Sequence, residues 1–164
     1  MASPSTDREH EEIRRFVERF AIVLASTGMA RMPARVFAYA LIDDADRYTA
    51  TELAAALQVS NAAISTSVRD LVNAGLLGKQ REPGARTDTY VLHGDDIWSE
   101  IYLQREGLLE QFEQIADEGV DLVGRERPGG RRMAETAAFF AFMRKEMPVL
   151  VERWRVYRQQ VMRE

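Results

Sequence analysis

Residues 49–93 read TATELAAALQVSNAAISTSVRDLVNAGLLGKQREPGARTDTYVLH, and this segment holds two capped helices followed by a hairpin. Thr49 and Glu52 have the spacing of a capping box, in which each side chain bonds the backbone amide of the other residue. The helix that they begin runs to about Leu57. After a short turn, Ser60 caps a second helix, which Gly75 terminates.

Two short apolar runs, 76–80 and 89–92, flank the turn signal Pro83-Gly84 and predict a hairpin with a long loop. Two helices joined by a turn of three or four residues, then a hairpin, match a winged helix-turn-helix. The sequence therefore predicts a chain that is mainly α with a small β-wing. Its function would be DNA binding through the second helix.

The second helix has two distinct faces. Ile64, Val68 and Leu71 are spaced four and three residues apart, so they should anchor the helix in the core. The opposite face is small and polar, which permits close approach to the major groove. Hydroxyls, an amide and a guanidinium there can bond to base edges or phosphates. The predicted DNA contacts of this helix are Ser60, Asn61, Ala62, Ser65, Thr66 and Arg69.

Two arginines complete the predicted contact set. Pro83-Gly84 places Arg86 at or beside the hairpin tip, where it could insert into a narrow minor groove. Arg81, on the strand side, is expected to contact phosphate and so to position the protein without reading sequence.

The flanking segments have helical apolar spacing and would form dimerisation helices. The first helix is expected from about residue 7 to Thr27, and a second from near Pro33. A long helix capped by Asp95 or Asp96 should extend through Leu122. A break at 128–130 precedes a final helix that Pro148 should kink or split. The expected organisation is a disordered tail (1–6), an N-terminal dimerisation helix (7–30), the winged helix-turn-helix (31–93) and C-terminal dimerisation helices (94–164).

The net charge of −4 is unevenly distributed. Residues 94–124 carry one basic and nine acidic side chains, whereas residues 125–164 carry ten basic and five acidic ones. Opposite charge should favour packing of these two segments together. Between Ser60 and Arg86 the balance is slightly basic, with four basic and two acidic side chains, which suits a DNA-binding surface.

Composition also argues against several other classes of protein. The chain has no cysteine and only two histidines, far apart in sequence, so neither a metal site nor another cofactor is expected. It has no phosphate-binding glycine loop and no Gly-x-Ser-x-Gly motif, so it is not expected to be an enzyme. A signal peptide and an apolar stretch of membrane-spanning length are both absent, which predicts a cytoplasmic protein without a membrane partner.

Three stretches resemble the reading domain of MarR-type regulators: Thr51-Glu52-Leu53-Ala54, Ile64 to Leu71, and Gly75-Leu76-Leu77. Gly28 to Met32 and Phe139 to Phe142 look like the GbsR-like branch of that family. The resemblance covers about residues 10–160. It implies a triangular dimer whose interface is formed by the terminal helices. A small effector would bind between this interface and the DNA-binding domain. The wing departs from the pattern, because Ala85-Arg86-Thr87 stands where an Asp and two Arg are common.

The sequence leaves two functions open. The first is a homodimeric, sequence-specific DNA-binding regulator, a repressor modulated by a small effector, whose pocket the residues do not identify. The terminal helices carry more apolar surface than one winged helix-turn-helix domain can cover, which predicts the homodimer. A two-fold dimer would place its two recognition helices about 34 Å apart. The alternative is a winged-helix module that binds protein and not DNA.

Overall fold

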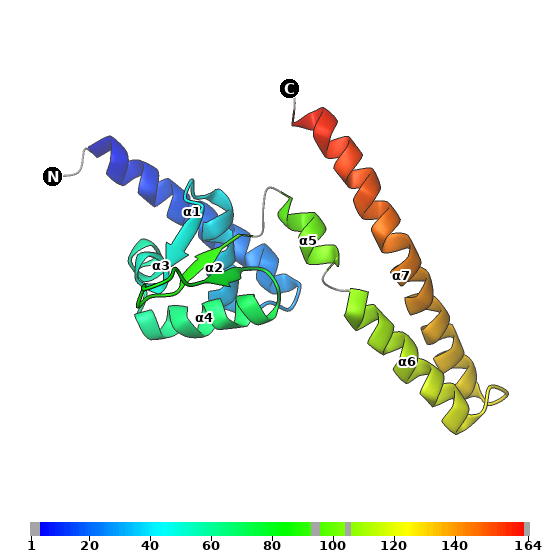
Figure 1. Cartoon of the computed structure of the whole chain (residues 1–164). Coiled ribbons are helices and arrows are strands. Elements are labelled where there is room, and N and C mark those ends of the chain that lie inside the picture. Colours follow the sequence, from blue (N-terminus) through cyan, green and yellow to red (C-terminus); the bar gives the residue numbers. More distant parts are fainter. Residues whose placement is uncertain (1–3, 93–95, 104–105, 163–164) are drawn as a thin grey trace. The chain divides into compact units, whose positions relative to one another are not determined.

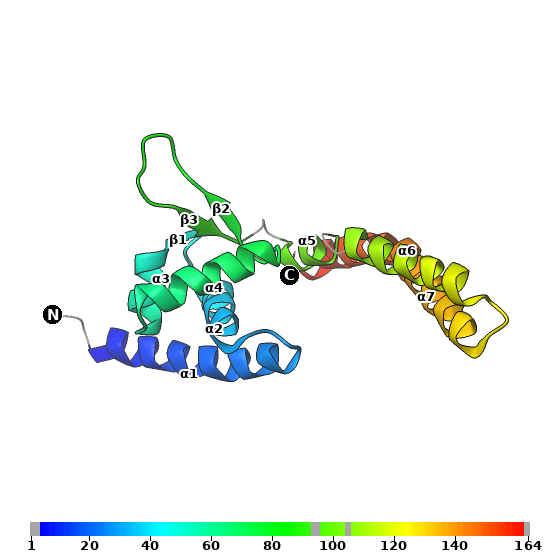
Figure 2. The same ribbon diagram turned by 90° about the horizontal axis from the view of Figure 1, so that it is seen from below.

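In the computed structural model, which describes residues 4–92, 96–103 and 106–162, the chain forms two compact units. The N-terminal unit (residues 1–95) contains four helices and a three-stranded sheet (Figures 1 and 2). Its elements are α1 (Pro4–Ser26), α2 (Arg31–Ile42), β1 (Arg47–Thr49), α3 (Ala50–Leu57), α4 (Asn61–Asn73), β2 (Gly78–Gln80) and β3 (Thr89–Val91).

The sheet of the N-terminal unit has the order β1-β3-β2, and both pairings are antiparallel. Strand β1 was not expected from the sequence. It forms because Tyr48 is buried against the helices while its neighbours Arg47 and Thr49 pair with β3. The predicted mainly helical, winged helix-turn-helix fold is confirmed.

The core of the N-terminal unit joins all four helices. α2 packs against α1, α3 and α4, and its Val36 and Phe37 are almost fully buried. From α1, Val17 and Ala21 enter the core. The helix α1 begins at Pro4, earlier than the sequence indicated, since proline suits the first turn of a helix. Residues 4–6, expected in a disordered tail, are therefore helical, and residues 1–3 lie outside the described part.

The C-terminal unit (residues 96–164) consists of α5 (Ile97–Leu103), α6 (Glu106–Val123) and α7 (Pro128–Val161). Both α5 and α6 pack against α7. The expected packing of the acidic segment on the basic one is thus confirmed, and Arg144 Nε lies 2.9 Å from Glu113 Oε2. The single long helix expected after Asp96 is wrong, because the structure has two helices there. Gly107, in the first turn of α6, is a poor residue for a continuous helix.

The reversal between α6 and α7 lies earlier than the sequence suggested. Gly124 adopts a φ of +87° and ends α6, whereas Pro128 to Gly130, expected to be the break, form the first turn of α7. Proline is favoured there because its missing N–H would have no helical partner. Gly130 is required by a close approach: a Cβ on it would lie 2.0 Å from the carbonyl oxygen of Gly124.

The helix α7 continues through Pro148, so the expected split does not occur. Proline inside a helix removes one backbone hydrogen bond and costs about 3 kcal/mol. Packing of α7 against α5 and α6, which contact it on either side of this position, offsets that cost. Within the described residues, no helix is both long and apolar enough to cross a membrane.

Candidate nucleic-acid interface

Two helix caps fix the geometry of the helix-turn-helix. The Thr49 hydroxyl accepts a hydrogen bond from the Glu52 amide (3.2 Å), and the Thr49 amide donates to Glu52 Oε2 (2.7 Å). Hydrogen bonds from the Thr49 amide and then from the Thr49 hydroxyl to the Glu52 carboxylate hold the pKa of that carboxyl below its usual value. At the end of α3, Gln58 adopts a left-handed conformation with a φ of 54°, which makes the turn toward α4 tight.

The second cap begins α4. The Ser60 hydroxyl accepts a hydrogen bond from the Ala63 amide at 3.3 Å, as the sequence predicted. One face of α4 is then fixed in the core, where Ile64, Val68 and Leu71 are each at most 1% exposed. Ser67 is buried beside them, and its hydroxyl donates to the carbonyl oxygen of Ala63 (2.8 Å).

The opposite face of α4 is exposed and carries the predicted recognition residues together. They are Asn61, Ala62, Ser65, Thr66 and Arg69, with Ser60 exposed at the start of the helix. None of these side chains is acidic, and only that of Arg69 is larger than an asparagine side chain. The face therefore offers hydroxyl, amide and guanidinium donors on a helix whose orientation is set by a rigid apolar base.

The wing is the hairpin of β2 and β3, which projects from the helices of its unit (Figure 2). Its tip is a turn over Glu82 to Ala85, where the Ala85 amide donates to the carbonyl oxygen of Glu82 (3.0 Å). Pro83 and Gly84 occupy the central positions, and the φ of +85° at Gly84 is the conformation that a type II turn requires there. Arg86 follows this turn and is exposed.

Arg81 is placed differently from Arg86, because Arg81 and Lys79 both lie against the Asp88 carboxylate on the other side of the hairpin. The Nη2 and Nε atoms of Arg81 each lie 2.7 Å from Asp88 Oδ1, and Lys79 Nζ lies 2.8 Å from Asp88 Oδ2. Hydrogen bonds from Arg81 and then Lys79 lower the pKa of Asp88 to about 2. Sequence reasoning missed Asp88 and Lys79. The signal was present, since alternate residues of one strand share a side of the hairpin.

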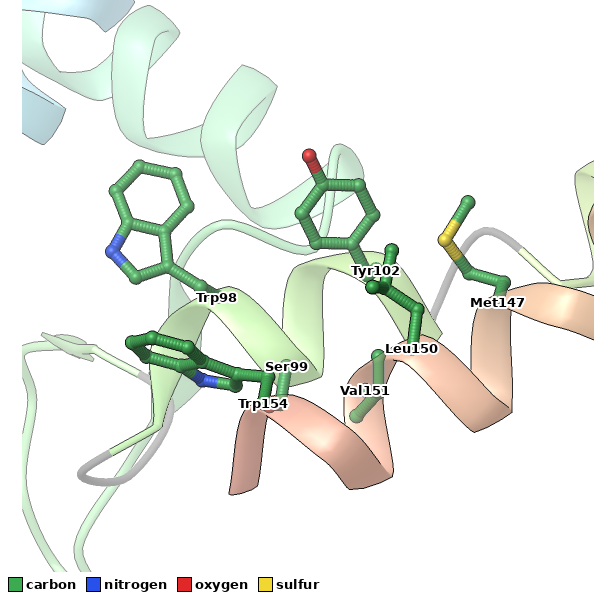
Figure 3. A pocket seen from close by; sticks show the side chains of 7 residues that line it. All are labelled: Trp98, Ser99, Tyr102, Met147, Leu150, Val151 and Trp154. Carbon is green, nitrogen blue, oxygen red and sulfur yellow. The ribbon is translucent and has the colours of Figure 1, made fainter. Parts of the chain in front are cut away.

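A pocket lies in the C-terminal unit, between α5 and α7 (Figure 3). Its volume is about 380 Å³. Trp154 closes one end, and its Nε1 donates to Asp96 Oδ1 (2.9 Å), which ties α7 to the cap of α5. The sequence did not identify this pocket. The lining residues are Trp98, Ser99, Tyr102, Met147, Leu150, Val151 and Trp154.

Comparisons with known proteins agree with this architecture. A family model for MmpR5-like MarR family transcriptional regulators matches residues 96–158. The chain is 28% identical over 133 residues to the HTH-type transcriptional regulator MmpR5 of Mycobacterium tuberculosis, covering 80% of each protein. A crystal structure of a transcriptional regulator is similar with a TM-score of 0.77 and 26% identity, covering 87% of this chain and 97% of that one. In fold and in sequence, the chain is thus similar to transcriptional regulators, and over residues 96–158 it is similar to those of the MarR family.

Proposed function

We propose that the chain is a transcriptional regulator of the MarR type, which binds double-stranded DNA sequence-specifically as a homodimer and represses transcription by occupying its operator. The observation that carries the proposal is the exposed face of α4, which lacks acidic side chains from Asn61 to Arg69 and stands on a fully buried apolar base. Solvated helix faces usually mix acidic and basic side chains, whereas a face that enters the major groove must admit the phosphates on either side. Repression at chromosomal DNA places the protein in the cytoplasm.

The test is a fluorescence-anisotropy titration of the full chain against labelled genomic fragments from around its own gene. We expect one fragment to bind with a Kd of about 10⁻⁸ M or tighter, at least about 10³-fold more tightly than random duplex. Its affinity should fall steeply with salt because bound phosphates release counterions. Binding that is equal for all fragments would contradict sequence-specific recognition. A complete lack of DNA binding would favour the protein-interaction module, which the comparisons do not support.

Within this proposal, each exposed basic side chain has a separate role. Arg69 lies on the α4 face and would contact guanine or a flanking phosphate. Arg81 would contact phosphate through Nη1, since its Nε and Nη2 atoms are the ones that lie against Asp88. Arg86, exposed beside the turn, would enter the minor groove.

We expect Arg86→Ala to weaken binding most at operators whose flanks are rich in A·T pairs. The narrow minor groove of such flanks has an enhanced negative potential that attracts an inserted arginine. The measurement is a titration of the parent and the variant against operators that differ only in A·T-rich or G·C-rich flanks. Equal affinity of parent and variant for both flanks would remove the wing tip from sequence readout.

The homodimer is supported by the exposed apolar surface of the C-terminal unit. Only Ala116 is buried among the 18 residues of α6, and only Gly130, Ala137 and Val151 among the 34 residues of α7. Two long antiparallel helices with so small a core need another partner to cover their apolar faces. We propose that a second copy of the chain covers these faces, because two-fold symmetry also supplies a second recognition helix. On α1, the exposed side chains of Ile22 and Val23 would add to this contact.

The pocket between α5 and α7 is the proposed effector site. Aromatic and aliphatic side chains dominate its lining, with the Ser99 hydroxyl as a polar exception, so an apolar or aromatic small molecule suits it. Trp98 and Trp154 are the two tryptophans of the chain, and both line this pocket. Their fluorescence therefore reports occupancy directly: an effector that releases DNA without changing tryptophan emission would bind elsewhere.

The finer placement in the GbsR-like branch also stays a proposal. Gly28 supports it, because its φ of +97° ends the first helix just before the Met29 to Met32 segment. Phe139 and Phe142 support it as exposed side chains on α7, where the proposed dimer contact lies.

A further inference from the structure

The hairpin contains two cations that share one carboxylate. Lys79 and Arg81 lie on the same side of the hairpin, and Asp88 faces them from the returning strand. The Asp88 side chain is only 19% exposed, whereas those of Lys79 and Arg81 are 50% and 60% exposed. Each Asp88 oxygen has a cation of its own, at 2.7 or 2.8 Å, so the carboxylate is fully occupied between them.

This cluster, Lys79–Arg81–Asp88, therefore presents a net charge of +1 to a DNA backbone, although it contains two cations. Two donor atoms of Arg81 already bond to Asp88, which also fixes the direction of its guanidinium. Arg86 differs, because within the described residues the structure records no ion pair for it. The hairpin thus has one unrestrained cation near its tip and two restrained ones near its base.

We propose that Asp88 limits how many phosphates the wing can neutralise, and so holds down the affinity of the protein for DNA of any sequence. The inference rests on the proposed DNA binding. Phosphate contacts are the same for every sequence, so each one raises affinity for operator and random DNA alike and adds no discrimination. Restraining two cations that touch only the backbone therefore lowers affinity for operator and random duplex alike and leaves discrimination to the contacts with bases.

The test compares Asp88→Asn with the parent on operator and on random duplex over a series of salt concentrations. Asparagine keeps the shape of the side chain but cannot neutralise Lys79 and Arg81. We expect the salt dependence, log K against log salt, to steepen by about 0.9 to 1.8, as one or two more phosphates are engaged. Affinity for random duplex should rise about tenfold at 0.1 M salt. The ratio of operator to random affinity should stay unchanged, because both affinities rise together.

Two further variants distinguish the effect of releasing Lys79 and Arg81 from the effect of merely removing one negative charge from the hairpin. Glu82→Gln removes the same charge from the same hairpin, where Glu82 pairs with Arg47 at 3.0 Å, but leaves the cluster intact. It should change the salt dependence less than Asp88→Asn does. The double variant D88N/R81Q returns the cluster to a net charge of +1 and should restore the parent slope.

Two results would overturn the inference while leaving the proposed function intact. One is an Asp88→Asn protein with the parent slope and the parent affinity for random duplex. The other is Glu82→Gln matching Asp88→Asn in both measurements. A parent protein that binds no DNA would instead remove the proposed function and this inference together. Thermal unfolding of each variant, measured in parallel, shows that the hairpin change has not unfolded the N-terminal unit.

Discussion

Replacing Ser65 or Thr66 with phenylalanine should abolish operator binding and leave the protein folded. Both side chains are exposed on the face of α4 opposite its buried base, so a larger side chain meets no neighbour within the protein. In the major groove the ring would collide with base edges and hold the helix out. We expect affinity for the operator to fall to that for random duplex, a loss of about 10³-fold or more. Thermal stability should change by no more than about 0.5 kcal/mol, as for other surface substitutions.

The adjacent Ser67 provides the matched control. It is 2% exposed, and its hydroxyl bonds to the carbonyl oxygen of Ala63, so Ser67→Phe should destabilise the core by about 1–3 kcal/mol or more through overpacking. Circular dichroism and anisotropy on the three variants distinguish the two effects. Full sequence-specific affinity in a folded Ser65→Phe or Thr66→Phe protein would show that α4 does not enter the groove.

Replacing Ile115 with glutamate should dissociate the homodimer. Leu108, Phe112, Ile115 and Leu122 recur at helical spacing along α6, and each is at least 47% exposed. A charge in the middle of this stripe would be buried without a partner on association, which is strongly unfavourable. Monomers engage one half-site rather than two, so operator affinity should fall by at least about 100-fold. Sedimentation equilibrium at micromolar concentration measures the first effect and anisotropy the second.

Gln114→Glu is the control, because it adds the same charge at the neighbouring position. Gln114 is exposed and turns toward the charged side of α6, about 100° around the helix from Ile115. It should remain dimeric and bind the operator as the parent does. A stable parent monomer in sedimentation, or an Ile115→Glu protein that stays dimeric, would contradict the proposed interface.

The helix-turn-helix could be predicted closely because its signals are local. The Thr49–Glu52 capping box, the Ser60 cap and the spacing of Ile64, Val68 and Leu71 each depend on residues within one or two turns. These features set both the helix boundaries and the face of α4 that stays exposed. The predicted recognition residues therefore lie together without any knowledge of the rest of the chain.

The features that were missed depend on residues distant in sequence. β1 has three residues and exists only because β3, whose residues lie 40 to 44 positions later, pairs with it. Asp88 acquires its two cations only once the hairpin has closed in the register that places Gln80 opposite Thr89. Similarly, the length of α7 depends on α5 and α6, whose packing retains the helix through Pro148. Local propensity predicts a break there because it contains no information about those neighbours.

Because the core of the C-terminal unit is small, the stability of this protein should depend on its concentration in the cell. With four buried residues in two long helices, most of the apolar contact that stabilises the unit would come from the second chain of the proposed homodimer. Folding and association then become one bimolecular event, and the melting temperature rises with protein concentration. Dilution as the cell grows would then expose these helices to proteases, so that the protein would be cleared fastest when it is scarce and its target genes would be released abruptly rather than gradually.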